Sequence, residues 1–586
     1  RDYKVTGVQT CALPILGQQF NRFLSSMYTG YNPEFLLTNI ARDFTAGFIN
    51  LTGNYGVKLA GQAIARYPSA VAALWRHIRT GQDPLIERYR AAGGSTGAAY
   101  LSDLERIGTD ITRVFQDFQG ARETWASGDK AGAVRVAVAD KLRLVGRHIE
   151  NMNKIGENAL RVATFKALLD ARKPEAEAAR AAGEVTVNFN RKGELASQLG
   201  GLYLFFNPSV QGTKAIWNAL SKGEHRGQAI ALSGALVGLA VVMAELARSG
   251  SDDDERRWRK IPGHTKDRNL IVPLPDGKEF MLPMPYGYGA FWSLGNVLSD
   301  LRHGEDGSKA GIRLASTLFE HFGPFGNPFA GDEADLRNIV SLLPTALKPP
   351  VALAMNRSEL GRPLMPETQP WNAERPDSQR MWRATQGTIY ERIATGINRL
   401  TGGSKYEAGA VDVSPESMRY LWRTLTGGVG QFAADTANLA AVLAQGAGGE
   451  TQPKEWPILR RFVRADSIQD ARSLFHEQAA KVREAESVFA AAKRDRDMTA
   501  MRDIRAERRS LLALGRFLDA ANRQIRARRQ LQDAIERADL PLAAKRLQLA
   551  TVEKQEEAIY GRFYDLFMRA SRAPVRASKA TATNGG

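Results

Sequence analysis

The residue type best suited to metal chemistry in this sequence is histidine, which occurs seven times. Histidine metal sites usually place two ligands three or four residues apart on a helix, or combine them with carboxylates at a recognisable spacing. No His-x-x-x-His pair occurs, so we expect no metal site and no cofactor. We also expect alanine at any one histidine to leave function intact. The histidines are His77, His148, His225, His264, His303, His321 and His476.

Other catalytic motifs are weak or absent. Gly287 and Gly289 resemble the start of a Gly-x-Gly-x-x-Gly dinucleotide loop, but Trp292 stands where the third glycine belongs. Neither a Gly-x-Ser-x-Gly elbow nor a Walker loop occurs. Asp43 and Glu157 are suitable as a glycosidase pair only if the fold brings them together, and nothing in the sequence does so. We therefore expect no catalytic residue and no small-molecule substrate in this chain.

The single cysteine, Cys11, lies within residues 1–15, which show neither helix caps nor periodicity. This stretch resembles the translated read-through of a sequencing adapter, and we expect it to be an artefact. The remaining sequence then lacks cysteine, which excludes disulfides, thiol nucleophiles and cysteine-ligated zinc. On this interpretation the chain is the C-terminal part of a longer protein.

The elements around these residues are mostly predicted helices. Apolar residues recur every three or four positions after Asn32 and Pro33, which fit the N-cap and first position of a helix. The first stripe is Leu36, Ile40, Phe44 and Phe48, and the second is Met152, Ile155, Ala159 and Val162. A third helix is expected to start at Asn207 and Pro208.

Three segments depart from this helical pattern. Residues 184–193 alternate apolar and polar side chains, as a short strand or an extended segment does. Glycine and proline clusters at 322–331 and 347–356 predict loops.

Residues 270–284 predict the one β-hairpin. A Pro-Asp-Gly turn at 275–277 separates Ile271 and Val272 from Phe280 and Leu282, so two short strands can pair. Prolines lack the amide that a sheet ladder needs, and we expect them to keep the arms from extending into a larger sheet. We interpret the hairpin as a structural clip. The prolines are Pro273, Pro283 and Pro285.

The longest uncharged run, Gly227 to Ala244, is borderline for a membrane span. As a helix it would be roughly 27 Å long, against a bilayer core of about 30 Å. Gly234 and Gly238 would admit a second helix, and Val237 marks the middle of the run. The alternative interpretation is a central helix of a soluble bundle.

The part after Asp466 is rich in charge and predicts helical hairpins or a coiled coil, with Pro541 as the break. Phe475, Val482, Ala485 and Phe489 are its expected inner positions. The chain carries a formal net charge of +17, and basic residues concentrate in this tail. Arg523, Arg526, Arg528 and Arg529 are candidate anion-binding residues for DNA phosphate or lipid headgroups. A solvated helix face is the alternative.

Taken in order, several motifs resemble the large polyvalent protein-associated domains found near the C-termini of giant tailed-phage and mobile-element proteins, specifically class thirty-eight. The resemblance covers roughly Leu16 to Val463 and implies a phage or prophage protein carried in the virion or delivered with DNA. Such domains are often joined to N-terminal enzymes such as peptidoglycan hydrolases, and the resemblance supplies no catalytic residues. The motifs are "YNPEFLLTNIARDF", "ENALRVATFKALL", "VNFNRKGELASQL", "FFNPSVQGTKA", "IVPLPDGKEFMLPMPYGYGAFW", "LLPTALKPPVALAMN" and "VSPESMRYL".

We therefore expect a mainly α, elongated multi-helix chain in four parts: the artefact at 1–15, a helical domain at 16–463, a basic helical tail at 464–572 and a disordered terminus at 573–586. The expected function is that of a non-catalytic internal virion protein that aids DNA ejection. A membrane-inserting channel component and the remainder of a larger enzyme are the alternatives. Expected partners are other virion proteins or a second copy, anionic membrane and non-specific DNA. The expected location is the virion interior, then the bacterial cytoplasm or envelope.

Overall fold

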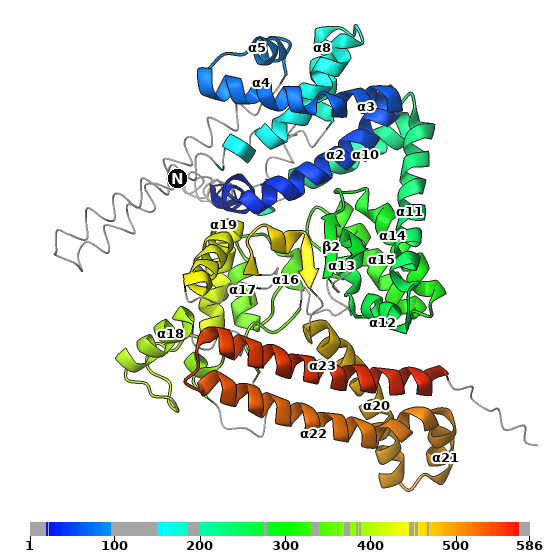
Figure 1. Ribbon diagram of the computed structural model, residues 1–586, viewed down its shortest axis with the longest axis vertical. Helices are drawn as coiled ribbons and strands as arrows, with labels where there is room; N and C mark the ends of the chain where they lie inside the picture. The colour runs from blue at the N-terminus through cyan, green and yellow to red at the C-terminus, as the bar shows by residue number, and fades with distance from the viewer. Residues whose placement is uncertain are drawn as a thin grey trace, which may run out of the picture.

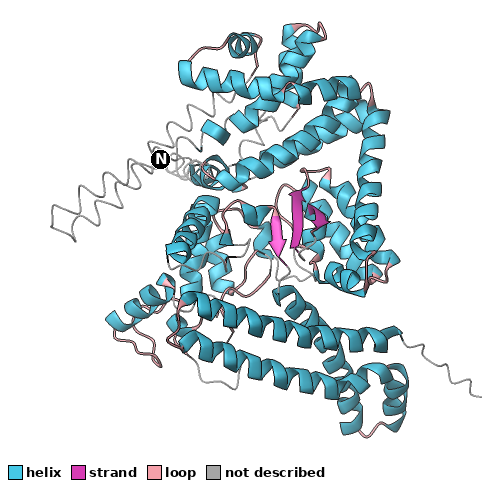
Figure 2. Ribbon diagram, viewed as in Figure 1, coloured by secondary structure: helices cyan, strands magenta, loops and turns pink. Residues whose placement is uncertain are grey.

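The computed structural model describes residues 19–94, 149–185 and 199–572, except for 22, 150, 154, 201, 205, 275–277, 330–338, 360, 368–374, 383–384, 386–387, 445–450, 452–454 and 466–467. The described chain is mainly helical with one small antiparallel sheet, which confirms the predicted fold class (Figure 2). Its helices form three tiers stacked along the long axis (Figure 1). The expected artefact, most of the strand expected at 184–193 and the terminus at 573–586 lie outside the described residues.

The upper tier packs its helices around an alanine-rich core that includes Tyr89 and Phe165. A helix over 155–170 runs through this core. The other elements of the tier are η1 (Ser26–Gly30), α2 (Pro33–Tyr55), α3 (Val57–Ala65), α4 (Tyr67–Thr80), α5 (Pro84–Ala91), α8 (Glu175–Glu184), α10 (Phe206–Trp217) and η2 (Asn218–Lys222).

The start of α2 follows the sequence prediction. The Asn32 side chain accepts a hydrogen bond from the Glu34 amide at 3.0 Å, and Pro33 is the first helical residue. Leu36 is buried, and the remaining residues of its stripe are half-buried.

Two details of the later helices differ from the prediction. Met152 is half exposed and does not belong to the buried stripe of Ile155, Ala159 and Val162. Helix α10 begins at Phe206, one residue before the predicted Asn207.

The middle tier contains the sheet and the long helix α11, which forms one edge of the molecule (Figure 1). Its elements are α11 (Arg226–Arg248), α12 (Asp252–Lys260), α13 (Gly263–Arg268), β1 (Asn269–Pro273), β2 (Lys278–Pro283), α14 (Gly289–Arg302), α15 (Gly307–Phe322), α16 (Ile339–Leu342), α17 (Lys348–Met355), η4 (Asp377–Gln379), α18 (Ile389–Leu400), α19 (Pro415–Ala444), η8 (Leu459–Arg461) and β3 (Val463–Ala465).

The predicted hairpin is present, but it belongs to a larger sheet. Strands β1 and β2 pair antiparallel with Val272 opposite Phe280, and the turn at 275–277 lies outside the described residues. Strand β3 pairs with the start of β2, with Phe280 opposite Val463. The expectation that the prolines would prevent a larger sheet was wrong, because Pro273 and Pro283 lie at strand ends and leave the start of β2 free to pair. The sheet thus joins the middle tier to the start of the C-terminal tail.

A second difference concerns residues 347–356, which were predicted as a loop. They contain α17, with Pro349 and Pro350 in its first turn. Proline is tolerated there because the first amides of a helix have no partner within the helix.

The lower tier consists of α20 (Ile468–Arg494), α21 (Met498–Glu507), α22 (Arg509–Arg537) and α23 (Leu542–Arg572). Helices α22 and α23 lie side by side, joined by a short connection that contains Pro541, as predicted (Figure 1). Phe475, Val482 and Ala485 are buried, and Phe489 is half-buried. Their core also includes Leu518, Ile525 and Phe563.

Candidate functional site

Helix α11 has two unlike faces. Its inner face packs against α14 and α2, with the small residues Ala229, Ser233, Ala240 and Ala244 buried. Leu232, Leu236 and Met243 are partly buried and also pack inward. Its outer face exposes large apolar side chains, namely Ile230, Leu239, Val242 and Leu246 at 54%, 47%, 52% and 61%. By length and composition α11 is the one described helix that could cross a membrane, and 22% of its most apolar window is buried. One face of α11 thus packs within the molecule, as expected of a bundle helix, and the other face is exposed.

The predicted helix-packing residues lie on or near this outer face. Gly234 and Gly238 are exposed, and a Cβ atom added at either would meet nothing within 4 Å. No described residue packs against Gly234 or Gly238, so this part of the outer face is open to an outside partner. Val237 is half-buried, and its carbonyl oxygen faces Gly295 of α14. Leu239 is therefore a better probe of the outer face than Val237.

The C-terminal end of α11 is anchored by a buried ion cluster centred on Asp300 of α14. Arg248 donates a hydrogen bond to Oδ1 of Asp300, and Arg313 donates to Oδ2 at 2.7 Å. Lys266 Nζ lies 3.5 Å from both oxygens, and Arg313 also binds Asp267 at 2.8 Å. The Trp258 ring lies beneath the Arg248 and Lys266 cations.

The electrostatics of this cluster follow from burial and pairing. Burial alone would raise the pKa of Asp300, but Lys266 and Arg313 hold it well below its usual range. Burial lowers the pKa of Lys266 to about 8 against the attraction of Asp300. Burial also raises the pKa of Asp267 despite Arg313. All three cations share Asp300, whereas Asp267, Glu305 and Glu255 each pair with one of them. Removal of the Asp300 charge would therefore leave buried positive charge poorly compensated.

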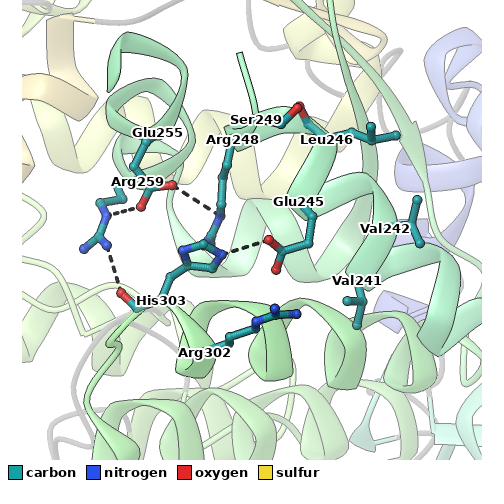
Figure 3. A pocket seen from close by; sticks show the side chains of 10 residues that line it. All are labelled: Val241, Val242, Glu245, Leu246, Arg248, Ser249, Glu255, Arg259, Arg302 and His303. Carbon is teal, nitrogen blue, oxygen red and sulfur yellow. Dashed lines mark hydrogen bonds and ion pairs between the residues drawn. The ribbon is translucent and has the colours of Figure 1, made fainter. Parts of the chain in front are cut away.

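A cavity of about 820 Å³ opens beside this cluster at the C-terminal ends of α11 and α14 (Figure 3). Val241, Val242 and Leu246 form its apolar wall. Its carboxylates are already engaged. Glu245 accepts from Ser299 and pairs with His303, both at 2.9 Å.

The cations of the cavity differ in how fully they are paired. Arg259 contacts Glu255 at 2.5 Å and donates to the His303 carbonyl oxygen at 2.9 Å. The Arg248 side chain is 4% exposed, and its Nη1 atom has no hydrogen-bond partner. Arg302 is exposed and makes no hydrogen bond or ion pair with another described residue. The cavity therefore offers the unpaired Arg302 guanidinium group beside an apolar wall.

The four arginines predicted to bind anions lie on α22. Arg523 and Arg526 are exposed and Arg528 is half-buried, and none of the three pairs with another described residue. Arg529 is 3.9 Å from the buried carboxylate of Glu556, so part of its charge is neutralised within the tail. Sequence reasoning missed Arg509 and Arg516, which precede Arg523 at intervals of seven residues and are also exposed. That interval is the signal that identifies one helix face.

The fold also brings together groups that the sequence keeps far apart. Glu245 and His303 are 58 residues apart and pair through α11 and α14. Asp43 lies close enough to Glu157 that burial, followed by the Glu157 charge, raises its pKa to about 7. His321 is buried, its Nδ1 accepts from the Gly287 amide, and burial lowers its pKa to about 4. Within the described residues no group of three His, Cys, Asp or Glu side chains could hold a metal ion.

Comparison with known proteins gives one match. No curated protein and no solved structure matches the chain. The family model described as large polyvalent protein associated domain 38 matches residues 255–459. This range is narrower than the predicted resemblance; it begins in α12, after α11, and ends before β3. Residues 255–459 are therefore similar to the large polyvalent protein associated domain 38, the class that the sequence motifs indicated.

Proposed function

We propose that this chain is a non-catalytic internal part of a phage or prophage protein that contacts the host membrane through α11 while DNA is delivered. The domain at 255–459 supports the phage association. The exposed apolar face of α11 is the observation that carries the membrane contact. Soluble monomers rarely expose apolar patches larger than a few hundred Å² unless the patches bind a partner or a membrane.

The anchoring of α11 supports this assignment. Its inner face and its Arg248 end are held by α14, so its outer face is presented on a fixed support. A helix held in this way can lie in or on the bilayer surface without unfolding of the middle tier. The interface would be apolar along α11, with the exposed Arg302 of α14 near its C-terminal end.

Flotation with phospholipid vesicles tests the proposal. Wild-type protein should float with the vesicles, and Leu239→Asp should not, because a charged side chain on the apolar face opposes its burial in the membrane. The matched control is Leu531→Asp, since Leu531 is 41% exposed on α22. Equal flotation of the two variants, or no flotation of wild type, would contradict the proposal.

A further inference from the structure

The cavity at the end of α11 carries an inference that rests on the proposed membrane contact and names its ligand. We propose that this cavity binds the headgroup of a zwitterionic phospholipid, one that carries a phosphate and a primary ammonium group. The acyl chains would lie along the apolar face of α11.

The phosphate would be bound by the guanidinium group of Arg302. Arg302 is exposed at the cavity without a partner among the described residues, whereas Arg248 is buried and paired with Asp300. A hydrogen bond between an ionised donor and an anionic oxygen is stronger than one between neutral groups. Arginine is also the side chain best suited to the oxygens of a phosphate.

The ammonium group would be bound by the carboxylates of the cavity. Glu245 and Glu255 line the same cavity, and a carboxylate has more acceptor positions than its present partners use. The C-terminal ends of α11 and α14 also meet here, and helix C-termini favour cations. These negative groups would weaken the binding of a simple anion, whereas a headgroup with both charges matches the cavity.

The apolar wall selects a lipid over a free headgroup. Val242 and Leu246 line the cavity and also belong to the exposed face of α11, so the wall continues directly into that face. The cavity lies where the uncharged part of the helix ends, which is the depth at which headgroups lie beside a membrane-facing helix. Its volume of about 820 Å³ is that of an ordinary small-ligand site.

The test measures binding of three probes to the full chain by calorimetry: dihexanoyl phosphatidylethanolamine, dihexanoyl phosphatidylglycerol and inorganic phosphate. Wild type should bind the ethanolamine lipid most tightly. Arg302→Gln should weaken both lipids about tenfold, because it removes a charge-assisted hydrogen bond. Glu245→Gln should weaken only the ethanolamine lipid. Val242→Ser should weaken the binding of both lipids and leave phosphate binding unchanged, because it removes apolar contact without adding charge.

The control is Arg516→Gln, an exposed arginine on α22 away from the cavity. If Arg302→Gln behaves like Arg516→Gln, or if phosphatidylglycerol or phosphate binds as tightly as the ethanolamine lipid, the assignment is overturned. The membrane contact itself is tested separately by flotation of Leu239→Asp. Short-chain lipid binding without flotation would support the cavity assignment and contradict the proposed function. Flotation with no effect of Arg302→Gln on lipid binding would support the proposed function and contradict the cavity assignment.

Discussion

Helices α11 and α22 are both long, lie in the middle and lower tiers, and differ in which side chains they bury and which they expose (Figure 1). Helix α22 buries Leu514, Leu518 and Ile525 and exposes arginines. Helix α11 buries alanine and serine and exposes isoleucine, leucine and valine. The first arrangement is that of an amphipathic helix in water.

The difference shows that apolar composition alone does not decide whether a helix belongs in a core. The inner face of α11 uses small residues because α14 approaches closely, as at Gly295, where an added Cβ would lie 2.3 Å from the Val237 carbonyl oxygen. Leu232, Leu236 and Met243 still pack inward, whereas Ile230, Leu239, Val242 and Leu246 are exposed. We infer that the outer face of α11 meets an apolar phase and that the arginine face of α22 meets water or a polyanion.

The largest expected effect is loss of the anchor that holds α11 in place. Asp300→Asn should lower the free energy of unfolding by about 3–5 kcal/mol, because it leaves buried cations without their shared carboxylate. Urea denaturation followed by circular dichroism measures the change. Asp519→Asn on the exposed side of α22 is the control and should stay within about 0.5 kcal/mol. Equal effects of the two substitutions would show that the cluster does not anchor α11.

Substitutions on the arginine face of α22, which includes Arg516 and Arg523, should change DNA binding and not stability. Replacing Arg516, Arg523 and Arg526 together by Gln should weaken binding to a random DNA duplex about tenfold at low salt. It should also reduce the slope of log affinity against log salt by roughly two to three. Fluorescence anisotropy measures both quantities. A triple Gln variant of the exposed Arg79, Arg392 and Arg399 is the control, and an equal loss there would remove any special role for α22.

Glycine substitutions should distinguish the two faces of α11. Gly295→Ala places a methyl group against the α11 backbone and should destabilise the protein by about 1–3 kcal/mol. Gly234→Ala meets open space and should stabilise by up to about 1 kcal/mol, since alanine favours helix. Thermal unfolding of both variants provides the comparison. Destabilisation by Gly234→Ala would indicate that the outer face is covered in the free protein.

A smaller, pH-dependent effect is expected at the cavity. Burial would raise the pKa of Glu245, but hydrogen bonds from His303 and Ser299 lower it below the usual 4.5. The pair therefore stabilises the fold above that pH, and the contribution is lost as pH falls through the lowered pKa. At pH 7 Glu245→Gln should cost about 0.2–1 kcal/mol. A difference from wild type that persists undiminished at pH 3 would exclude this linkage.

Much of the fold could be predicted from local patterns. The cap at Asn32, the hairpin and the helical tail each depend on residues close in sequence. The third strand could not be predicted, because β3 is three residues long and pairs across more than 180 positions. The Asp300 cluster could not be predicted for the same reason, because its members come from four separate helices, α11, α13, α14 and α15.

The candidate site could likewise be predicted only in part. The sequence indicated that Gly227 to Ala244 was unusual, but composition is the same for a core helix and for a membrane-facing one. Only the structure shows that Ala240 packs inward and Leu239 is exposed. The cavity beside Arg302 was not predictable, since it is formed where two helix ends meet.

The most direct test of the central claim is a nitroxide spin label at position 239, compared with one at 531, in a chain with Cys11 replaced by Ser. Collision with oxygen and with a water-soluble nickel complex reports the phase around each label. On addition of phospholipid vesicles, the label at 239 should gain oxygen accessibility and lose nickel accessibility, while the label at 531 should not change. A label at 239 that stays as accessible to nickel with vesicles as without them would contradict the account.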